Sequence, residues 1–180
     1  MKEPFHNAGD IEISNEIYKY KLFNTLELIN IIKYNPILTN SMEECVKELR
    51  KRGKFNILDL VSESIQMNPL ECYYLILHDE SYNVLFTSRL FFDIDKSKGY
   101  ICMVCTSNTF RNKGVCKIML NKLIELINEI CKCQIFSLEV DPYNIPAIKC
   151  YENVGFIFVK EIIFYSNNEK HIYNIMELTK

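Results

Sequence analysis

The sequence lacks the one-sided runs of residues that mark several classes of protein. It has no block of like charge and a net charge of only −2, so the electrostatic footprint of a nucleic-acid-binding protein is missing. No apolar run is long enough to span a bilayer, and the polar first residues, MKEPFHNAGD, do not resemble a secretory signal. We therefore expect a cytoplasmic, intracellular protein with no nucleic-acid partner and no membrane partner.

Paired metal-binding motifs are also missing, although the chain contains eight cysteines. Most of them lie in apolar runs, which is typical of reduced, buried thiols. Cys102 and Cys105 have the CxxC spacing, but an odd offset in a strand would place them on opposite faces. No second pair follows at zinc spacing, and Cys131 and Cys133 have no histidine nearby. We predict no metal site.

The residues that are present have the balance of one globular domain. Hydrophobic residues make up 48% of the 180-residue chain and charged residues 24%, a composition and length that support a single core. No repeat, linker or low-complexity segment divides the chain. We expect a loose leader at 1–10 and one domain over 11–180, acting as a monomer or homodimer.

The first part of the chain is predicted from hydrophobic periodicity to contain a short strand and then helices. Ser41 and Glu44, three residues apart, have the spacing of a capping box and should open the second helix. The predicted elements are a strand at 11–13, helices at 15–32 and 42–52, and an ambiguous segment at 55–66.

The remainder of the chain has the order of a mixed sheet. The predicted elements are strands at 71–77, 84–92 and 100–105, a helix at 113–131, a strand at 134–140, a helix at 146–153 closed by Gly155, and a hairpin of 156–165 with 171–178. The first three strands are joined by short polar turns and should form an antiparallel meander. The next strand follows a helical crossover and should lie parallel to the third. The fold class is therefore α/β (α+β), with helices on the faces of the sheet.

The stretch 100–120 is predicted to run strand, turn, helix, and its turn ends in the sequence RNKGVC. Gly114 would stand at the start of the helix, where several N–H groups lack partners and the helix dipole is positive. Glycine also allows a ligand to approach the backbone closely. This corner is a candidate phosphate site. The absence of a Gly-Lys-Ser/Thr sequence argues against an ATP-binding loop.

A second motif begins about two dozen residues later. It consists of Leu138-Glu139-Val140, Asn144, Ala147, Tyr151 and Gly155-Phe156. Together with Arg111-x-x-Gly114-x-Cys116, it resembles the acetyl-CoA-binding core of the GNAT acetyltransferase superfamily. The resemblance covers about 70–178 and is strongest to the branch that acetylates protein N-termini, including the ribosomal-protein acetylases. It implies a single-domain GNAT fold, with a mostly antiparallel sheet, a splayed parallel strand pair and flanking helices.

The resemblance also implies a seat for acetyl-CoA. The pantetheine arm would lie along the end of the third strand and the pyrophosphate on the N–H groups of the turn. The residues implied in cofactor binding are Val104, Cys105, Thr106, Arg111, Asn112, Lys113, Gly114, Val115, Cys116 and Asn144. Cys116 replaces the family's glycine or alanine and adds bulk where the phosphate would approach, but cysteine is still small, and we expect the cofactor affinity to be retained. Asn144 either contacts the coenzyme or caps the following helix.

Two catalytic residues are implied as well. Tyr151 stands at the position of the tyrosine that acts in the family as the general acid, protonating the departing CoA thiolate. The alternative to this role is a tyrosine that only packs in the core. Glu139 resembles the base of the N-terminal acetylases, and strand alternation should turn it away from its two apolar neighbours. Partial burial would raise the pKa of Glu139 toward the range that a general base needs. The alternative to the base role is a structural carboxylate, bonded to backbone or water. The pair Phe164-Tyr165 is similar to a tyrosine pair that lines the family's peptide slot.

The function that follows is an acetyl-CoA-dependent N-acetyltransferase, in which a primary amine attacks directly in a ternary complex. A peptide or protein N-terminus is the first expected acceptor. The alternatives are a small amine, such as a polyamine or amino sugar, and an acyl-CoA-binding module without activity.

Overall fold

The computed structural model describes residues 8–47, 57, 61, 72–93, 95–166 and 169–180, and one mixed sheet runs through them. Its strands are β1 (Ala8–Ile13), β2 (Glu16–Asn24), β3 (Cys72–His78), β4 (Val84–Phe92), β5 (Lys98–Thr106), β6 (Ile135–Val140), β7 (Ile157–Ser166) and β8 (Glu169–Thr179). Their spatial order is β1-β2-β3-β4-β5-β6-β8-β7. Only β5 and β6 are parallel; the other neighbouring pairs are antiparallel. The predicted meander, parallel crossover and mixed α/β fold class are confirmed.

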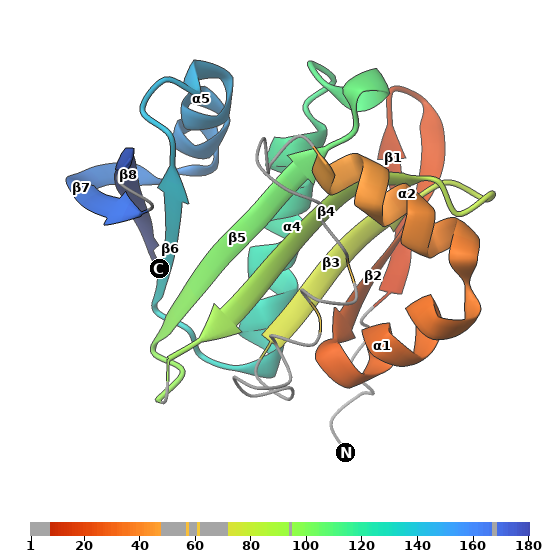
Figure 1. Cartoon of the computed structure of the whole chain (residues 1–180). Helices are drawn as coiled ribbons and strands as arrows, with labels where there is room; N and C mark the ends of the chain where they lie inside the picture. The colour runs from red at the N-terminus through yellow and green to blue at the C-terminus, as the bar shows by residue number, and fades with distance from the viewer. Residues whose placement is uncertain (1–7, 48–56, 58–60, 62–71, 94, 167–168) are drawn as a thin grey trace.

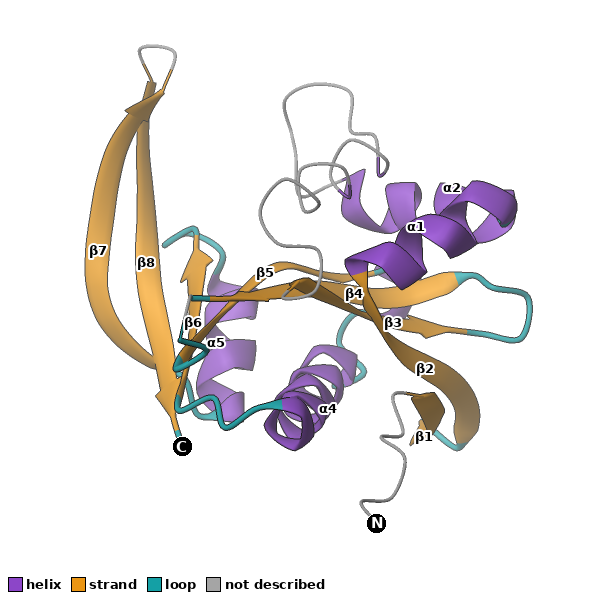
Figure 2. Ribbon diagram, turned by 90° about the horizontal axis from the view of Figure 1, so that it is seen from below, coloured by secondary structure: helices purple, strands orange, loops and turns teal. Residues whose placement is uncertain are grey.

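Helices cover both faces of this sheet (Figures 1 and 2). They are α1 (Thr25–Tyr34), α2 (Pro36–Val46), the short 3-10 helix η2 (Asn108–Phe110), α4 (Val115–Ile130) and α5 (Ile145–Val154). Figure 2 shows α1 and α2 on one side of the sheet and α4 on the other, with α5 beside β6. None of the described helices is long and apolar enough to cross a membrane.

Each face of the sheet has its own hydrophobic core. The α4 side buries, among others, Phe86, Met119, Leu123, Phe136, Tyr151 and Phe156. The α1–α2 side buries Phe23, Leu28, Met42, Cys45, Tyr74 and Cys105, among others. Two separate cores explain why β3 is a nearly continuous apolar run, since a strand covered on both faces needs no polar alternation. These cores hold β5 and β6 in place between the two helical layers.

The predicted helix at 15–32 is wrong in its first half, where β2 forms. Tyr18 and Leu22 are buried while Ile17 is 71% exposed, which is the two-residue period of a strand rather than a helical period. The helix begins only at α1, where Asn24 and Glu27 form a complete capping box. Strand β1 begins at Ala8, three residues before the predicted strand and within the leader predicted at 1–10; residues 1–7 lie outside the described residues.

The capping box predicted at Ser41 and Glu44 is also wrong. Helix α2 begins earlier, at Pro36, and its cap is Asn35, whose side chain accepts a hydrogen bond from the Leu38 N–H at 3.0 Å. Proline at the first helical position favours a start there. The Ser41 hydroxyl instead accepts from the Val84 N–H and ties α2 to β4. The predicted end of this helix, at 48–52, and most of the segment 55–66 lie outside the described residues.

The carboxyl-terminal half follows the predicted order closely. Helix α4 occupies most of the predicted 113–131, and α5 ends at Gly155 as expected, with φ 111 at that residue. The hairpin of β7 and β8 forms, and β8 lies between β6 and β7. This insertion brings β8 next to the parallel pair, where the candidate site lies.

Candidate active site

The candidate site is centred on a gap between β5 and β6. The two strands pair only over residues 98–101 and 135–138, and beyond these they diverge toward their carboxyl ends (Figure 1). Cys105 and Thr106 remain paired with β4 on their other side. Among the described residues no strand pairs with the β6-facing edge of 102–106, which includes Val104. The splayed parallel pair predicted from the resemblance is confirmed.

A β-bulge in β5 lies where the gap opens. Arg89 of β4 is opposite Cys102 and Thr87 is opposite Cys105, so β5 has one extra residue in this interval. Met103 within it adopts φ 53. Because Thr87 and Arg89 share a face of β4, Cys102 and Cys105 also share a face of β5. The prediction that they lie on opposite faces is wrong, since a bulge reverses the alternation.

The amino terminus of α4 lies just beyond the end of β5. Gly114 is the N-cap residue, with φ 75, and a Cβ added there would meet nothing within 4 Å. No described side chain caps this helix end, and the first helical hydrogen bond runs from the Ile118 N–H to the Gly114 carbonyl. The N–H groups of Val115, Cys116 and Lys117 therefore have no acceptor within the helix. This end of α4 has the properties of an anion-binding site.

The side chains of the turn have separate neighbours. Arg111 Nε donates to the Thr106 carbonyl at 3.3 Å and ties the turn to the end of β5. Lys113 Nζ lies 4.5 Å from the centre of the aromatic ring of η2. Asn112 adopts φ 62, and Val115 is only 1% exposed. Val115 therefore offers a ligand its backbone N–H and not its side chain.

Tyr151 lies on the α4 side of the gap, where it is 7% exposed. Its ring packs edge-on against Phe156, with ring centres 6.2 Å apart. Burial raises the pKa of the Tyr151 phenol well above its usual range, and the nearby thiols of Cys116, Cys150 and Cys105 act in the same direction. The phenol therefore keeps its proton at neutral pH and remains a hydrogen-bond donor.

Glu139 lies on the opposite face of β6. Its neighbours Leu138 and Val140 are buried beneath α4, whereas Glu139 is exposed. The predicted alternation is confirmed, but the predicted partial burial is wrong. Burial, together with charges that include Glu139, raises the pKa of the Cys102 thiol to about 11.

An aromatic row on the β7–β8 hairpin continues the face of Glu139. Ile175 is paired with Glu139, so Tyr173 and His171, at alternate positions of β8, point to the same side. The Phe164 ring stacks on His171 and Tyr173, with ring centres 5.1 and 5.6 Å apart. His171 and Tyr173 are absent from the predicted site, although the H-x-Y-x-I alternation is visible in the sequence.

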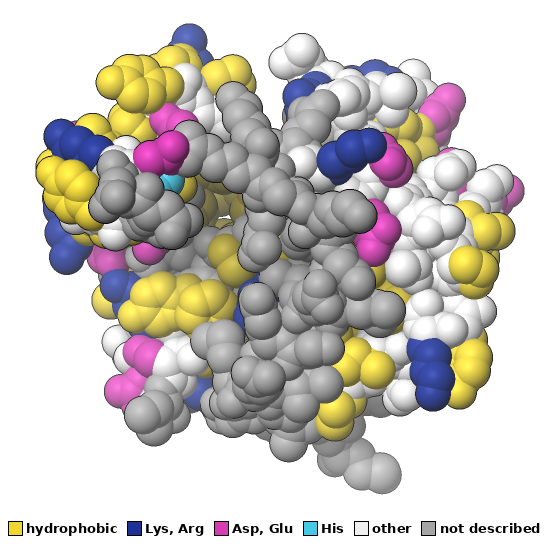
Figure 3. Space-filling view, in the orientation of Figure 1, with side chains coloured by type: hydrophobic (Ala, Val, Ile, Leu, Met, Phe, Trp, Pro, Cys, Tyr) yellow, Lys and Arg dark blue, Asp and Glu magenta, His cyan; other side chains and the backbone are white. Residues whose placement is uncertain are grey.

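Tyr165 does not belong to this row. It is paired with Lys170, on the other face from Glu139, and is 74% exposed. The hairpin also exposes other large apolar side chains: Ile157, Phe158, Val159 and Ile163. Figure 3 shows hydrophobic atoms at the surface on the side of the molecule where the hairpin lies. Of the pair predicted to resemble a peptide slot, only Phe164 lies on the side of the gap that Glu139 faces.

Asn144 serves as the N-cap of α5. Its side-chain oxygen accepts a hydrogen bond from the Ala147 N–H at 3.3 Å, and Pro146 follows within the first turn. Of the two predicted alternatives, the capping role is therefore present in the structure. This cap fixes the start of the short helix that positions Tyr151.

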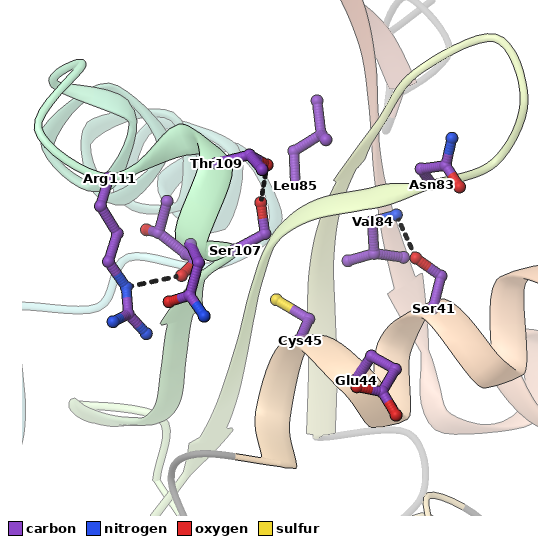
Figure 4. Close-up of a pocket in the computed structure, with 11 residues that line it drawn as sticks. Ser41, Glu44, Cys45, Asn83, Val84, Leu85, Ser107, Thr109 and Arg111 are labelled. Atoms are coloured by element: carbon purple, nitrogen blue, oxygen red, sulfur yellow. Dashed lines mark hydrogen bonds between the residues drawn. The ribbon is translucent and has the colours of Figure 1, made fainter.

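A pocket of ≈ 280 Å³ lies beside the gap, between α2 and the turn after β5 (Figure 4). It is lined by Ser41, Glu44, Cys45, Asn83, Val84, Leu85, Thr106, Ser107, Asn108, Thr109 and Arg111. Only Thr106 and Arg111 among the predicted site residues line it, and Tyr151 and Glu139 do not. The pocket adjoins the predicted cofactor seat without containing the predicted chemistry.

All eight cysteines lie in the described part of the chain, and each is a free thiol. Cys45, Cys72, Cys105 and Cys133 are buried, and the other four are half-buried. Among the described residues, no group of three or more His, Cys, Asp or Glu side chains is placed to hold a metal ion.

A family model described as the acetyltransferase (GNAT) family matches residues 63–156. This chain belongs to the GNAT family. The match includes the β5 bulge, the turn before α4, the whole of β6 and the helix that carries Tyr151. The matched segment therefore includes both strands that border the gap, β5 and β6.

Curated relatives of this GNAT chain include N-terminal acetyltransferases. NAA20, the catalytic subunit of the N-terminal acetyltransferase B complex of Arabidopsis thaliana, is 31% identical over 72 residues, which are 40% of this chain and 41% of the relative. N-alpha-acetyltransferase 30 of Dictyostelium discoideum is 37% identical over 68 residues, 38% of this chain and 36% of that protein. The matched segments thus span about two fifths of each relative's length.

Solved structures share the GNAT fold over most of the chain. The NatC complex bound to Gag peptide and CoA has a chain with a TM-score of 0.65 and 21% identity, covering 89% of this chain and 97% of that one. Ribosomal-protein-S5-alanine acetyltransferase from Vibrio fischeri has a TM-score of 0.63 and 14% identity, covering 95% and 96%. A variant of spermidine N-acetyltransferase SpeG from Vibrio cholerae has a TM-score of 0.65 and 12% identity, covering 90% and 93%.

Proposed function

We propose that this GNAT protein transfers an acetyl group from acetyl-CoA directly to a primary amine. The observation that carries the proposal is the gap between β5 and β6. Tyr151 lies on the α4 side of the sheet, and Glu139 lies on the opposite face of β6. The start of α4, which no side chain caps among the described residues, lies just beyond the end of β5. One elongated molecule lying along the gap would meet all three.

The residues around the gap fit coenzyme A in two respects. The N–H groups of Val115, Cys116 and Lys117 offer unused donors to a diphosphate, and Gly114 leaves the approach to them open. The edge of β5 that faces the gap pairs with no described strand, and a strand edge presents alternating donors and acceptors, which suit the amides of the pantetheine arm. When bound, the coenzyme supplies the acetyl group as an activated thioester.

Tyr151 supplies the proton for the departing thiolate in this proposal. A buried phenol with a raised pKa stays protonated until a stronger base develops beside it. This role is supported by the place of Tyr151 on the helix that follows β6, in the core on the α4 side of the sheet. The phenol acts as a general acid and takes no part in binding the diphosphate.

Glu139 acts as the general base in this proposal. It is exposed on the face that α1 and α2 share with the aromatic row of His171, Tyr173 and Phe164. An amine entering from that side meets the carboxylate before it reaches the gap. Glu139, directly or through a water that it holds, accepts the proton that the amine must lose to become nucleophilic.

Glu139→Gln is expected to lower kcat by about 10²-fold, because loss of a general base typically costs at least that much. The affinity for CoA should stay close to that of the wild type, since the amide keeps the shape of the carboxyl group. Glu161→Gln is the matched control: it lies on the other face of the sheet, opposite Asn174. Equal rates for the two variants in a steady-state assay would remove Glu139 from the base role.

A peptide N-terminus is the acceptor that we propose first. N-terminal acetyltransferases are among the curated relatives, and the aromatic row offers flat surfaces on which a first side chain can pack. The second candidate is a small amine, because the fold is also that of a spermidine N-acetyltransferase.

A thiol-release assay separates these acceptors. A short peptide with a free α-amine should release CoA faster than the same peptide with a blocked α-amine, and faster than spermidine or an amino sugar. A higher rate with spermidine than with every free peptide would favour the small-amine function. CoA binding without turnover on any acceptor would indicate a binding module instead.

A further inference from the structure

One fully buried hydroxyl has no hydrogen-bond partner. Ser88, in the middle of β4, is 0% exposed, and among the described residues its Oγ is the one buried side-chain nitrogen or oxygen atom without a partner. Thr25, whose side chain is equally buried, donates its hydroxyl to the Cys72 carbonyl at 3.3 Å. An unpaired buried hydroxyl lowers the stability of a folded protein, so Ser88 carries a cost that packing alone does not explain.

The Ser88 side chain points into the core on the α4 side of the sheet. Phe86 and Leu90, which precede and follow it by two residues along β4, are buried in that core, and side chains alternate along a strand. Leu75, which is paired with Ser88 on β3, is buried in the same core. Tyr151 belongs to this core as well. The unpaired hydroxyl is therefore on the side of the sheet that carries the proposed acid.

The register shift between β4 and β5 falls at Ser88. Its neighbours along β4 are paired with Cys102 and Cys105, so Met103 and Val104 of the β5 bulge lie opposite Ser88. Among the described residues, neither of the two has a strand partner on β4 or β6. Met103 also has φ 53, a conformation that is strained for a residue with a side chain and that is common at functional sites. The hydroxyl thus lies beside strained backbone that the ladder leaves unpaired.

We propose that Ser88 is a positioning residue of the gap between β5 and β6, and that its acceptor is a backbone carbonyl of the β5 bulge. When coenzyme A lies along the gap, the bulge turns the carbonyl of Met103 or Val104 toward Ser88, and the hydroxyl donates to it. The coenzyme favours the arrangement of the bulge in which this hydrogen bond is made, and the hydrogen bond in turn favours binding. The inference rests on the proposed function, in which coenzyme A occupies the gap.

Melting of the full chain without CoA tests the first half of this inference. Ser88→Ala should raise the melting temperature by about 2–4 °C, because the variant no longer buries a hydroxyl without a partner. Thr25→Val is the matched control and should lower the melting temperature, since it removes a hydroxyl that has an acceptor. A lower melting temperature for Ser88→Ala would overturn the inference, because the hydroxyl would then have a partner without the coenzyme.

A calorimetric titration with CoA tests the second half. Ser88→Ala should bind CoA roughly three- to tenfold more weakly than the wild type, the effect of losing one hydrogen bond, whereas Thr25→Val should bind it as the wild type does. Amide hydrogen exchange at saturating CoA adds a readout that a packing role would not change: peptides that span 102–106 should exchange faster in Ser88→Ala than in the wild type. Equal exchange in the two proteins would contradict the positioning role.

The titration also separates this inference from the proposed function. A wild-type protein that does not bind CoA would overturn both. CoA binding by the wild type, with equal affinity in Ser88→Ala, would overturn only the role of Ser88 and would leave the serine as a packing residue.

Discussion

Gly114→Glu is expected to weaken CoA binding by about 10³-fold or more. A carboxylate about 4 Å from a phosphate charge costs roughly 4 kcal/mol at an effective dielectric constant near 20. The side chain would also enter the open space above the first N–H groups of α4, where a Cβ meets nothing within 4 Å. Isothermal titration with CoA measures the change directly.

Gly114→Ala is the matched control for this variant. Residue 114 has φ 75, so any side chain there costs about 1–2 kcal/mol of backbone strain, and the alanine variant carries that cost without the charge. We expect Gly114→Ala to bind CoA within a few-fold of the wild type. Normal CoA binding by a folded Gly114→Glu protein would show that the turn before α4 is not the phosphate seat.

Tyr151→Phe is expected to lower kcat by about 10²-fold with little change in the affinity for CoA. The substitution removes the proton donor but keeps the ring that packs against Phe156. Since burial raises the pKa of Tyr151, the wild type should not lose rate through ionisation of this phenol up to the ordinary tyrosine value of about 10. A pH–rate profile and a CoA titration on both proteins check these expectations.

Tyr143→Phe provides the comparison for Tyr151→Phe. Tyr143 is 85% exposed and precedes α5, so its hydroxyl lies outside the buried cluster. This variant should match the wild type in both turnover and CoA affinity. If Tyr151→Phe also turned over at the wild-type rate, the tyrosine would be a packing residue and the thiolate would obtain its proton from solvent.

The starts of α4 and α5 were predictable because their signals are local. A glycine before an apolar helical pattern predicts the start of α4, and Asn144 followed by Pro146 predicts the cap of α5. Both predictions depend only on neighbours in sequence, and the structure contains both features. The meander of β3 to β5 and the parallel crossover to β6 followed from the same local patterns, whereas the place of β8 between β6 and β7 did not.

The errors come from features that depend on distant contacts. The bulge at Met103 reverses alternation in β5, so Cys102 and Cys105 share a face that a regular strand would not give them. The exposure of Glu139 depends on which elements cover its face of β6, and the residue pattern of β6 itself does not show this. The aromatic row of His171 and Tyr173 emerges only once β8 is known to pair with β6.

The amino-terminal error has a different cause. Apolar residues from Ile17 to Ile32 recur at spacings that fit a helix, but the first of them belong to β2. Alternation of Tyr18 and Tyr20 with Lys19 and Lys21 was the competing signal. Tertiary contacts decided between the two, because β2 pairs with β3 over residues 19–24 and with β1 at its start.

Acetyl transfer itself is the central claim, and a stoichiometric product measurement tests it most directly. The protein is incubated with acetyl-CoA and a peptide with a free α-amine, and both the CoA thiol and the acetylated peptide are quantified. We predict equal amounts of the two products, with the acetyl group on the α-amino nitrogen by fragment mass spectrometry. CoA release without an acetylated amine, on this peptide or on spermidine, would contradict the account.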